Sequence, residues 1–318
     1  MTTTYSLEFP RAHGEPLGKA GFREQLEDFY VNEDLGFTCD GSGEHVYLHV
    51  EKRGDNTEWL ARSIARLAGV EPRDVGYCGL KDRHGVTRQW FSVYFPKGDE
   101  PDWQALNSET VTLLEATRHK QKLRRGQHRS NGFVIVLRNL SADKTAVDAR
   151  LQLIAAQGVP NYFGEQRFGI GGGNLEAANR MLVEGIKVKN RHKRSLYLSS
   201  ARSYLFNQVL AKRIEQGLWR TSIEGDIEEG GCVTGPLWGR GRLATSAEAK
   251  ALEETVLAPW QHWLEPLEFT GLKQERRALV NMPEALNWHW QGEHLQLSFS
   301  LGVGAYATSL LRELIEWE

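Results

Sequence analysis

The sequence predicts an α/β protein built around a mixed sheet. Short apolar or alternating runs, which are typical of strands, occur between segments that have the apolar spacing of helices. Several strand-like runs are joined by links too short for the crossover that parallel neighbours need, so the sheet cannot be wholly parallel. With 318 residues, 40% of them hydrophobic, the chain is long enough for one large or two ordinary domains.

The first half of the chain supplies most of the predicted strands. A loop over residues 17–30 leads into a first strand, and further strands are expected at 45–50, 75–80, 90–95, 111–114 and 133–137. One helix is predicted over 57–68. Asn56 or Thr57 caps its start, and Gly69 ends it.

The second half is predicted to be more helical. Ser141 is expected to cap a helix that runs to about Gln157. Further helices are expected near 175–183, 200–216, 245–257 and 305–317, with a strand at 295–301, a basic loop before residue 200 and an irregular segment over 221–243. The glycines of 169–174 lack the spacing of a nucleotide-binding loop, so a turn before a helix is the better interpretation.

Cysteine usage and the N-terminus indicate a cytoplasmic protein. Cys39, Cys78 and Cys232 are odd in number and far apart, which supports neither a disulfide framework nor a CxxC metal site. The first ten residues lack a basic start followed by an apolar core, and no run approaches the length of a membrane span. We therefore expect no metal and no membrane association, and a monomer because no association motif is apparent.

The net charge of −2 gives no overall attraction to a nucleic acid, but the charges are segregated. Seven Lys or Arg and no acid lie between Arg118 and Arg138, and eight, again without an acid, lie between Lys187 and Arg213. Such segregation can give a nearly neutral molecule one basic face. The alternative is that these are two solvated loops that happen to be basic.

A tight charged loop lies between the strands predicted at 75–80 and 90–95. Lys81, Asp82, Arg83 and His84 are crowded where the chain must turn. The single carboxylate among three cations should stay ionised, because the cations favour its charged form. It is placed to act as a nucleophile or a charge anchor, whereas the plainer interpretation is a solvated turn.

Five collinear motifs decide between these interpretations. They are Gly79-Leu-Lys-Asp-Arg followed by Val86-Thr-Arg-Gln, Leu26-Glu-Asp-Phe, Ser130-Asn-Gly-Phe, Pro160-Asn-Tyr-Phe-Gly-Glu-Gln-Arg-Phe-Gly, and Gly304-Ala-Tyr-Ala-Thr-Ser with Leu311-Arg-Glu-Leu. Together they resemble the TruD family of pseudouridine synthases over nearly the whole chain. One such match would be weak, but five in the family's order are strong.

The resemblance implies a fold, a domain division and an activity. Residues 1–156 and 282–318 would form a catalytic domain with a bent, mostly antiparallel mixed sheet flanked by helices. Residues 157–281 would form an inserted α/β domain, and a cleft between the domains would hold the RNA. The family isomerises a uridine of transfer RNA, uridine 13, to pseudouridine and uses no cofactor and no metal.

The resemblance also assigns roles around Asp82, the match to the catalytic aspartate. The acid attacks the ribose, forms an adduct with the base or removes a sugar proton, and the sequence leaves these routes open. Arg23 matches a basic position, often lysine in the family, and is the expected partner of the acid. Wall or supporting positions of the site are matched by Glu27, Phe29, Lys81 and Gln89.

Base and backbone contacts follow from the same resemblance. A uridine inside folded RNA must be flipped out, and Phe133 matches the ring that stacks on it, while Asn131 is suited to the uracil edge. Tyr306 matches a position usually held by phenylalanine; alternatively, these rings are ordinary core aromatics. Gly85 stands where the family commonly has a small residue such as alanine, and we expect it only to loosen the loop. The residues expected to contact the RNA backbone are Lys120, Lys122, Arg124, Arg125, Lys189, Arg191 and Lys193.

Two other functions compete with this one. A non-catalytic tRNA-binding protein would need the basic surface but not an acid at its centre. A nucleoside or glycoside hydrolase would need a second carboxylate beside Asp82, and only Glu27 can be nominated from the sequence.

Overall fold

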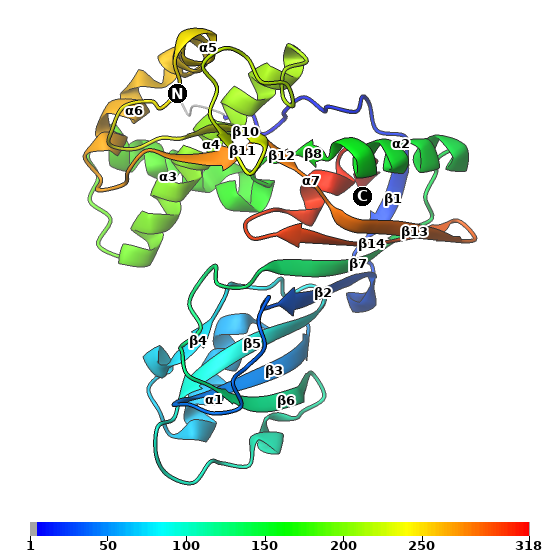
Figure 1. The fold of residues 1–318 in the computed structure, drawn as a ribbon, viewed down its shortest axis with the longest axis vertical. Coiled ribbons are helices and arrows are strands. Elements are labelled where there is room, and N and C mark those ends of the chain that lie inside the picture. The colour runs from blue at the N-terminus through cyan, green and yellow to red at the C-terminus, as the bar shows by residue number, and fades with distance from the viewer. Residues whose placement is uncertain (1–4, 318) are drawn as a thin grey trace. The chain divides into compact units, whose positions relative to one another are not determined.

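The computed structural model describes residues 5–317, and the chain packs into two compact units (Figure 1). The sheet unit comprises residues 17–147, 283–304 and 315–317, and the helical unit comprises residues 5–16, 148–282 and 305–314. These units are defined by packing. The catalytic and inserted domains expected from the resemblance are a functional division, and their boundaries stay a prediction.

The sheet unit is organised by ten hydrogen-bonded strands. They are β1 (Lys19–Phe22), β2 (Phe29–Asp34), β3 (His45–Arg53), β4 (Val75–Tyr77), β5 (Val86–Tyr94), β6 (Val111–His119), β7 (Ser130–Arg138), β13 (Glu284–Gln291), β14 (His294–Gly302) and β15 (Glu316–Trp317). The main path runs β13-β14-β7-β2-β5-β3-β6, with β4 on β5 and β1 joining β7 to β15. Two pairs, β2–β5 and β1–β15, are parallel and the others are antiparallel, which confirms a mixed sheet.

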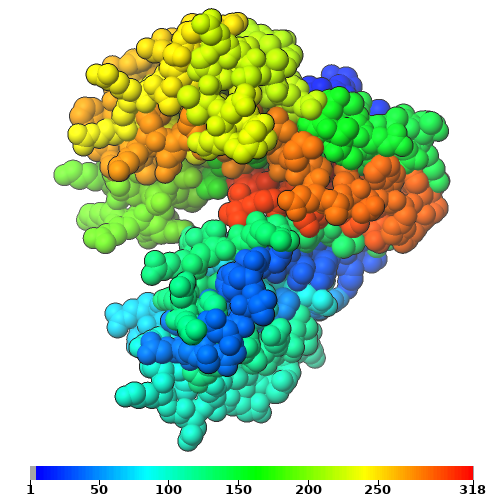
Figure 2. Space-filling model, viewed as in Figure 1, coloured from blue at the N-terminus to red at the C-terminus, as the bar shows by residue number. Residues whose placement is uncertain are grey.

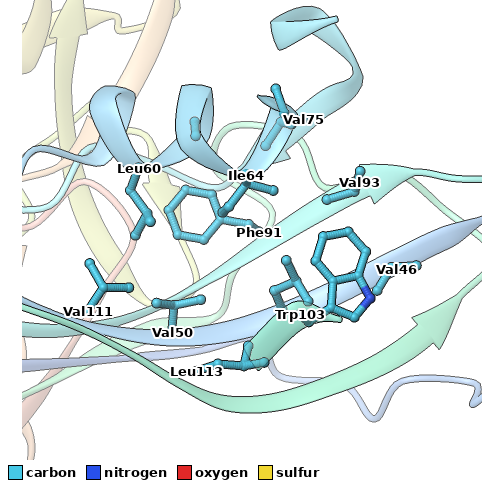
Figure 3. Packing of buried hydrophobic residues seen from close by; sticks show 13 residues of the cluster. Val46, Val50, Leu60, Ile64, Val75, Phe91, Val93, Trp103, Val111 and Leu113 are labelled. Atoms are coloured by element: carbon cyan, nitrogen blue, oxygen red, sulfur yellow. The ribbon is translucent and has the colours of Figure 1, made fainter. Parts of the chain in front are cut away.

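Helix α1 (Thr57–Ala68) has the predicted bounds because both of its ends are set locally. The side chain of Asn56 accepts a hydrogen bond from the backbone N–H of Glu58, and Gly69 takes a left-handed φ of 65° at the other end. Leu60 and Ile64 on its buried face pack against side chains of β3, β5 and β6 (Figure 3). In the view Phe91 lies near the centre of this cluster, to which β4 and β5, the strands that flank the charged loop, both contribute side chains.

The helical unit carries most of the helices and two small sheets. The remaining α-helices are α2 (Lys144–Gln157), α3 (Gly173–Leu182), α4 (Arg191–Glu215), α5 (Ala247–Leu257), α6 (Gln261–Glu268) and α7 (Ala307–Leu311). The strands are β8 (Val159–Pro160), β9 (Glu228–Glu229), β10 (Cys232–Leu237), β11 (Glu275–Ala278) and β12 (Val280–Asn281). Its core lies around α4, where Tyr204 and Leu205 are buried with Trp263 of α6. No helix among residues 5–317 combines the length and the apolar character needed to cross a bilayer.

Several local predictions were wrong; the segment 221–243, expected to be irregular, contains strand β10, which pairs with β11. Helix α2 begins at Lys144 with Asp143 accepting from the N–H of Ala146 at 2.8 Å, because Ser141 is instead bonded to the backbone of Lys19. Half of the expected basic loop is helical, because the side chain of Asn190 caps α4. The closing helix is short, since residues 316 and 317 pair with β1 as a strand.

Candidate active site

The loop between β4 and β5 presents Asp82 at the surface of the sheet unit. One carboxylate oxygen of Asp82 lies 3.1 Å from Nη2 of Arg23, and the two side chains are 36% and 17% exposed. The acid is therefore neither in open solvent nor sealed in the core. Arg23, nominated from the sequence as its partner, is the cation that contacts it.

Arg23 adopts a backbone conformation that side chains rarely take. Its φ is 63°, in the left-handed region, which costs a non-glycine residue of the order of 1 kcal/mol or more. Its guanidinium lies 3.9 Å from the ring centroid of Phe29 and 4.9 Å from that of Phe22. Stacking on these faces and the ion pair with Asp82 offset the backbone strain.

Lys81 points away from Asp82 and into the protein. Its ammonium lies 2.6 Å from Oε2 of Glu33, and both side chains are almost fully buried, at 7% and 0% exposure. It also donates to Oδ1 of Asn131 at 2.6 Å, and the amide nitrogen of Asn131 contacts His128 at 3.1 Å. The sequence places Lys81 as a support of the loop, and these contacts fit that role.

Gln89 and Thr57 hold the start of the loop. The hydroxyl of Thr57 donates to Oε1 of Gln89 at 2.8 Å and accepts from the backbone N–H of Lys81 at 3.1 Å. Both side chains are buried, so Gln89 lies inside and supports the loop. Because Thr57 begins α1, these two hydrogen bonds also attach the loop to the first turn of that helix.

Lys52 is a residue of this site that the sequence reasoning missed. Its fully buried ammonium donates to the backbone carbonyl of Asp82 at 3.0 Å and to that of Asp55 at 2.7 Å. Burial lowers the pKa of Lys52 to about 8. A signal was present, because Lys52 occupies an inward position of β3, in phase with the buried Val46 and Val50, where a charged residue needs internal partners.

Three phenylalanines from neighbouring strands form a row beside Arg23. The ring centroids of Phe29 and Phe133 are 6.0 Å apart, and those of Phe133 and Phe299 are 5.4 Å apart. Their exposures of 2%, 9% and 3% show that they are largely packed in the core. Only part of the Phe133 surface is therefore open to a ligand in this state.

Glu27, the candidate second acid of a hydrolase, has a cation as its partner. Its carboxylate forms an ion pair with Arg53, and its side chain is 57% exposed.

Tyr306 lies in the helical unit. Its hydroxyl accepts a hydrogen bond from Nη2 of Arg167 at 2.8 Å. The hydroxyl that distinguishes it from phenylalanine therefore has a protein partner.

The basic stretches divide into inward and outward residues. In the first, Arg138 forms an ion pair with buried Asp28, whereas Lys120, Arg124 and Arg125 are exposed and Lys122 donates to a backbone carbonyl. In the second, Arg202 and Arg213 are buried with internal partners. The exposed members there include Lys189, Arg191 and Lys193, from the loop after α3 and the first turn of α4, a surface drawn in light green in Figure 2.

One cluster has the residue types of a metal site. Ligand atoms of Glu33, Cys78 and His128 lie within 4.8 Å of one another, and all three residues are buried. However, the ammonium of Lys81 already neutralises Glu33, and burial raises the pKa of Cys78 to about 12, so the thiol keeps its proton. The cluster fits a hydrogen-bonded support for the loop better than a metal centre.

Gly85 is required by a close contact, which corrects the expectation that it only loosens the loop. A Cβ at this position would lie 2.5 Å from the carbonyl oxygen of Phe29 and 3.0 Å from its ring. Gly85 and Phe29 therefore approach too closely for any side chain at residue 85 without a shift of β2.

We predict that Gly85→Ala lowers the free energy of unfolding by about 1–3 kcal/mol, because the added methyl forces the backbone of Phe29 away. Gly79→Ala is the matched control in the same loop, since a Cβ there meets nothing within 4 Å. Chemical denaturation of the two variants measures the difference. Equal stabilities would show that β2 yields without cost.

We predict that Lys52 makes stability depend on pH. Because burial lowers its pKa from 10.5 to about 8, the unfolded chain binds more protons than the folded chain between these values. The free energy of unfolding of the wild type, relative to Lys52→Met, should therefore rise by up to about 3 kcal/mol as the pH increases through this window. Denaturation curves at several pH values test this, with exposed Lys97→Met as the control; parallel pH profiles for wild type and Lys52→Met would contradict it.

Known proteins match this sequence over nearly its whole length. The family model described as tRNA pseudouridine synthase D (TruD) matches residues 15–187. A protein of Cellvibrio japonicus named tRNA pseudouridine synthase D is 52% identical over 316 residues, covering 98% of this chain and 94% of that protein. One of the same name from Methylococcus capsulatus is 46% identical, with 98% and 95% covered.

A solved structure shares the fold. It is described as the putative tRNA pseudouridine synthase D of Methanosarcina mazei and superposes with a TM-score of 0.69 at 20% identity, covering 96% of this chain and 95% of that one. The two proteins therefore share a fold, whereas the family assignment rests on the sequence matches. The chain belongs to the tRNA pseudouridine synthase D (TruD) family.

Proposed function

We propose that this protein is a tRNA pseudouridine synthase that isomerises uridine 13 of transfer RNA, with Asp82 as the catalytic residue. Membership of the family supports the reaction. The observation that carries the site is the partly exposed Asp82 carboxylate, paired with Arg23 and held from inside through its own backbone by Lys52. The uridine number rests on the resemblance alone.

The reaction needs an ionised carboxylate next to the nucleoside. The bond between C1′ of the ribose and N1 of uracil breaks, the base turns, and C1′ bonds to C5; C5 loses a proton and N1 gains one. The change is an isomerisation and is redox-neutral, so no cofactor enters the balance. Asp82 takes part by attacking the ribose, by adding to the base or by removing a sugar proton, and Arg23 keeps its charge compensated before the substrate arrives.

The RNA must present the uridine outside its stack. We propose that the base is flipped towards Asp82, with Phe133 stacking on it and Asn131 reading its polar edge. Asn131 is pre-positioned for this by Lys81 and His128, which hold its amide from the protein side. Phe29 supports Phe133 and Arg23, whereas the resemblance alone nominates Glu27 and the ring of Tyr306 as further wall positions.

The alternative functions place different requirements on the Asp82 carboxylate. A hydrolase needs a second carboxylate at the reacting centre, but Glu27 is paired with Arg53. A non-catalytic tRNA-binding protein has no use for a strained Arg23 that pairs with a partly exposed acid. The binding alternative remains the second candidate, since the exposed basic residues alone would serve it.

We predict that Asp82→Asn abolishes pseudouridine formation but leaves tRNA affinity within about tenfold, because affinity comes mainly from phosphate contacts. Mass spectrometry of unmodified tRNA after incubation separates the functions: isomerisation leaves the mass unchanged and requires a chemical label, hydrolysis leaves an abasic site, and binding leaves uridine. Near-normal turnover by Asp82→Asn would remove this residue from the mechanism.

We predict that the exposed basic residues provide the salt-dependent part of binding. Replacing Lys120, Arg124, Lys189 and Arg191 together by alanine should weaken tRNA binding and reduce the slope of log K against log salt by about one for each lost phosphate contact. Lys97 and Lys250, exposed lysines outside both stretches, are replaced as the control. An unchanged slope would place the basic stretches off the RNA path.

A further inference from the structure

The charge of Arg167, in the helical unit, has only neutral partners among the residues that the structure describes. Its Nη1 donates to Oγ of Ser199 at 3.1 Å, and its Nη2 donates to the hydroxyl of Tyr306 at 2.8 Å. Its Nε is buried and has no hydrogen-bond partner among the described residues. Within residues 5–317, no carboxylate forms an ion pair with this guanidinium. Its contacts are therefore neutral.

The two hydroxyls around Arg167 remain able to donate. Each uses an oxygen lone pair to accept from the guanidinium, and among residues 5–317 neither the O–H of Ser199 nor that of Tyr306 donates to another acceptor. A cation beside two free O–H donors is the complement of an anionic oxygen ligand. All three residues are partly exposed.

The cluster packs against an aromatic ring that a second guanidinium also contacts. The ring of Tyr306 packs edge-on against Phe163, with centroids 6.3 Å apart. The guanidinium carbons of Arg277 and Arg167 lie 4.2 Å and 5.5 Å from the centroid of the same Phe163 ring. Burial, together with the positive charge of Arg167, lowers the pKa of Arg277 to about 10. Two cations around one aromatic ring attract an anion more strongly than either alone.

We propose that Arg167, Ser199 and Tyr306 form a binding site for one phosphate of the RNA backbone. The site rests on the proposed function in that its phosphate belongs to the tRNA substrate. A phosphodiester offers two anionic oxygens, which can accept from the guanidinium and from both hydroxyls. The two parts of Tyr306 then have different roles: its ring packs on Phe163, and its hydroxyl binds the RNA phosphate.

The test uses variants that remove one donor at a time. Tyr306→Phe keeps the ring, Ser199→Ala keeps the helix, and Arg167→Gln keeps the length of the side chain without its charge. We expect tRNA affinity to fall about three- to tenfold for each hydroxyl and more for the arginine, and the salt slope to decrease by about one only for Arg167→Gln. Ser195→Ala, one turn earlier on α4, and Tyr197→Phe are the matched controls, and thermal unfolding checks that each variant is folded.

The source of the phosphate is identified with modified RNA. Neutral methylphosphonate linkages are placed one at a time along a synthetic tRNA. One of these neutral linkages should weaken binding by the wild type more than the others do. The same linkage should have no special effect on binding by Arg167→Gln. If every linkage costs the same in wild type and variant, or if Tyr306→Phe and Ser199→Ala bind as the wild type does, the site is not an RNA phosphate site. Competition by inorganic phosphate that is lost in Arg167→Gln, with tRNA affinity unchanged, would point to a free anion and overturn the proposal.

The same preparations separate this inference from the proposed reaction. Pseudouridine formation by the wild type with unaltered tRNA affinity in the variants would reject the phosphate site and leave the enzyme proposal standing. Linkage-specific binding without pseudouridine formation would reject the enzyme proposal and leave the phosphate site standing.

Discussion

The site depends on buried cations that hold the Asp82 loop from inside. Lys52 bonds the backbone carbonyl of Asp82, and Lys81 is bound between Glu33 and Asn131. Burying an ammonium costs several kcal/mol unless it finds partners, and here the partners are main-chain and side-chain oxygens of the loop and its neighbours. Movement of the loop would leave these charges unsatisfied, so the contacts anchor the backbone that presents the partly exposed carboxylate.

A second constraint acts from the outer side of the loop. Arg23 is held in a left-handed conformation by the face of Phe29 and by Asp82 itself. Backbone strain of this kind persists where surrounding contacts determine it, and it is common at functional sites. Gly85 completes the arrangement, because the close approach of its backbone to Phe29 places the end of the loop against the ring that supports Arg23.

The lysines and arginines of this chain are divided between the interior and the surface. A nearly neutral chain that binds an anionic partner must divide its positive charges between interior and surface. Arg138, Arg202 and Arg213 are used internally, each with a carboxylate partner. Arg167 differs from these three, since its hydrogen-bond partners are two hydroxyls. Charge counts along the sequence cannot separate these classes, because burial depends on the fold.

The sequence by itself determined what local chemistry controls. The bounds of α1 follow from Asn56 and Gly69, and the opposite directions of Lys81 and Asp82 follow from their adjacent positions on an extended chain. The motifs identified the family and nominated Arg23. Only the tertiary structure decided that Lys52 reaches residue 82, that the last strand pairs with β1 and that Tyr306 meets Arg167. Each of these contacts joins residues far apart in the chain, and no local pattern specifies which distant oxygen or strand edge will satisfy a buried donor.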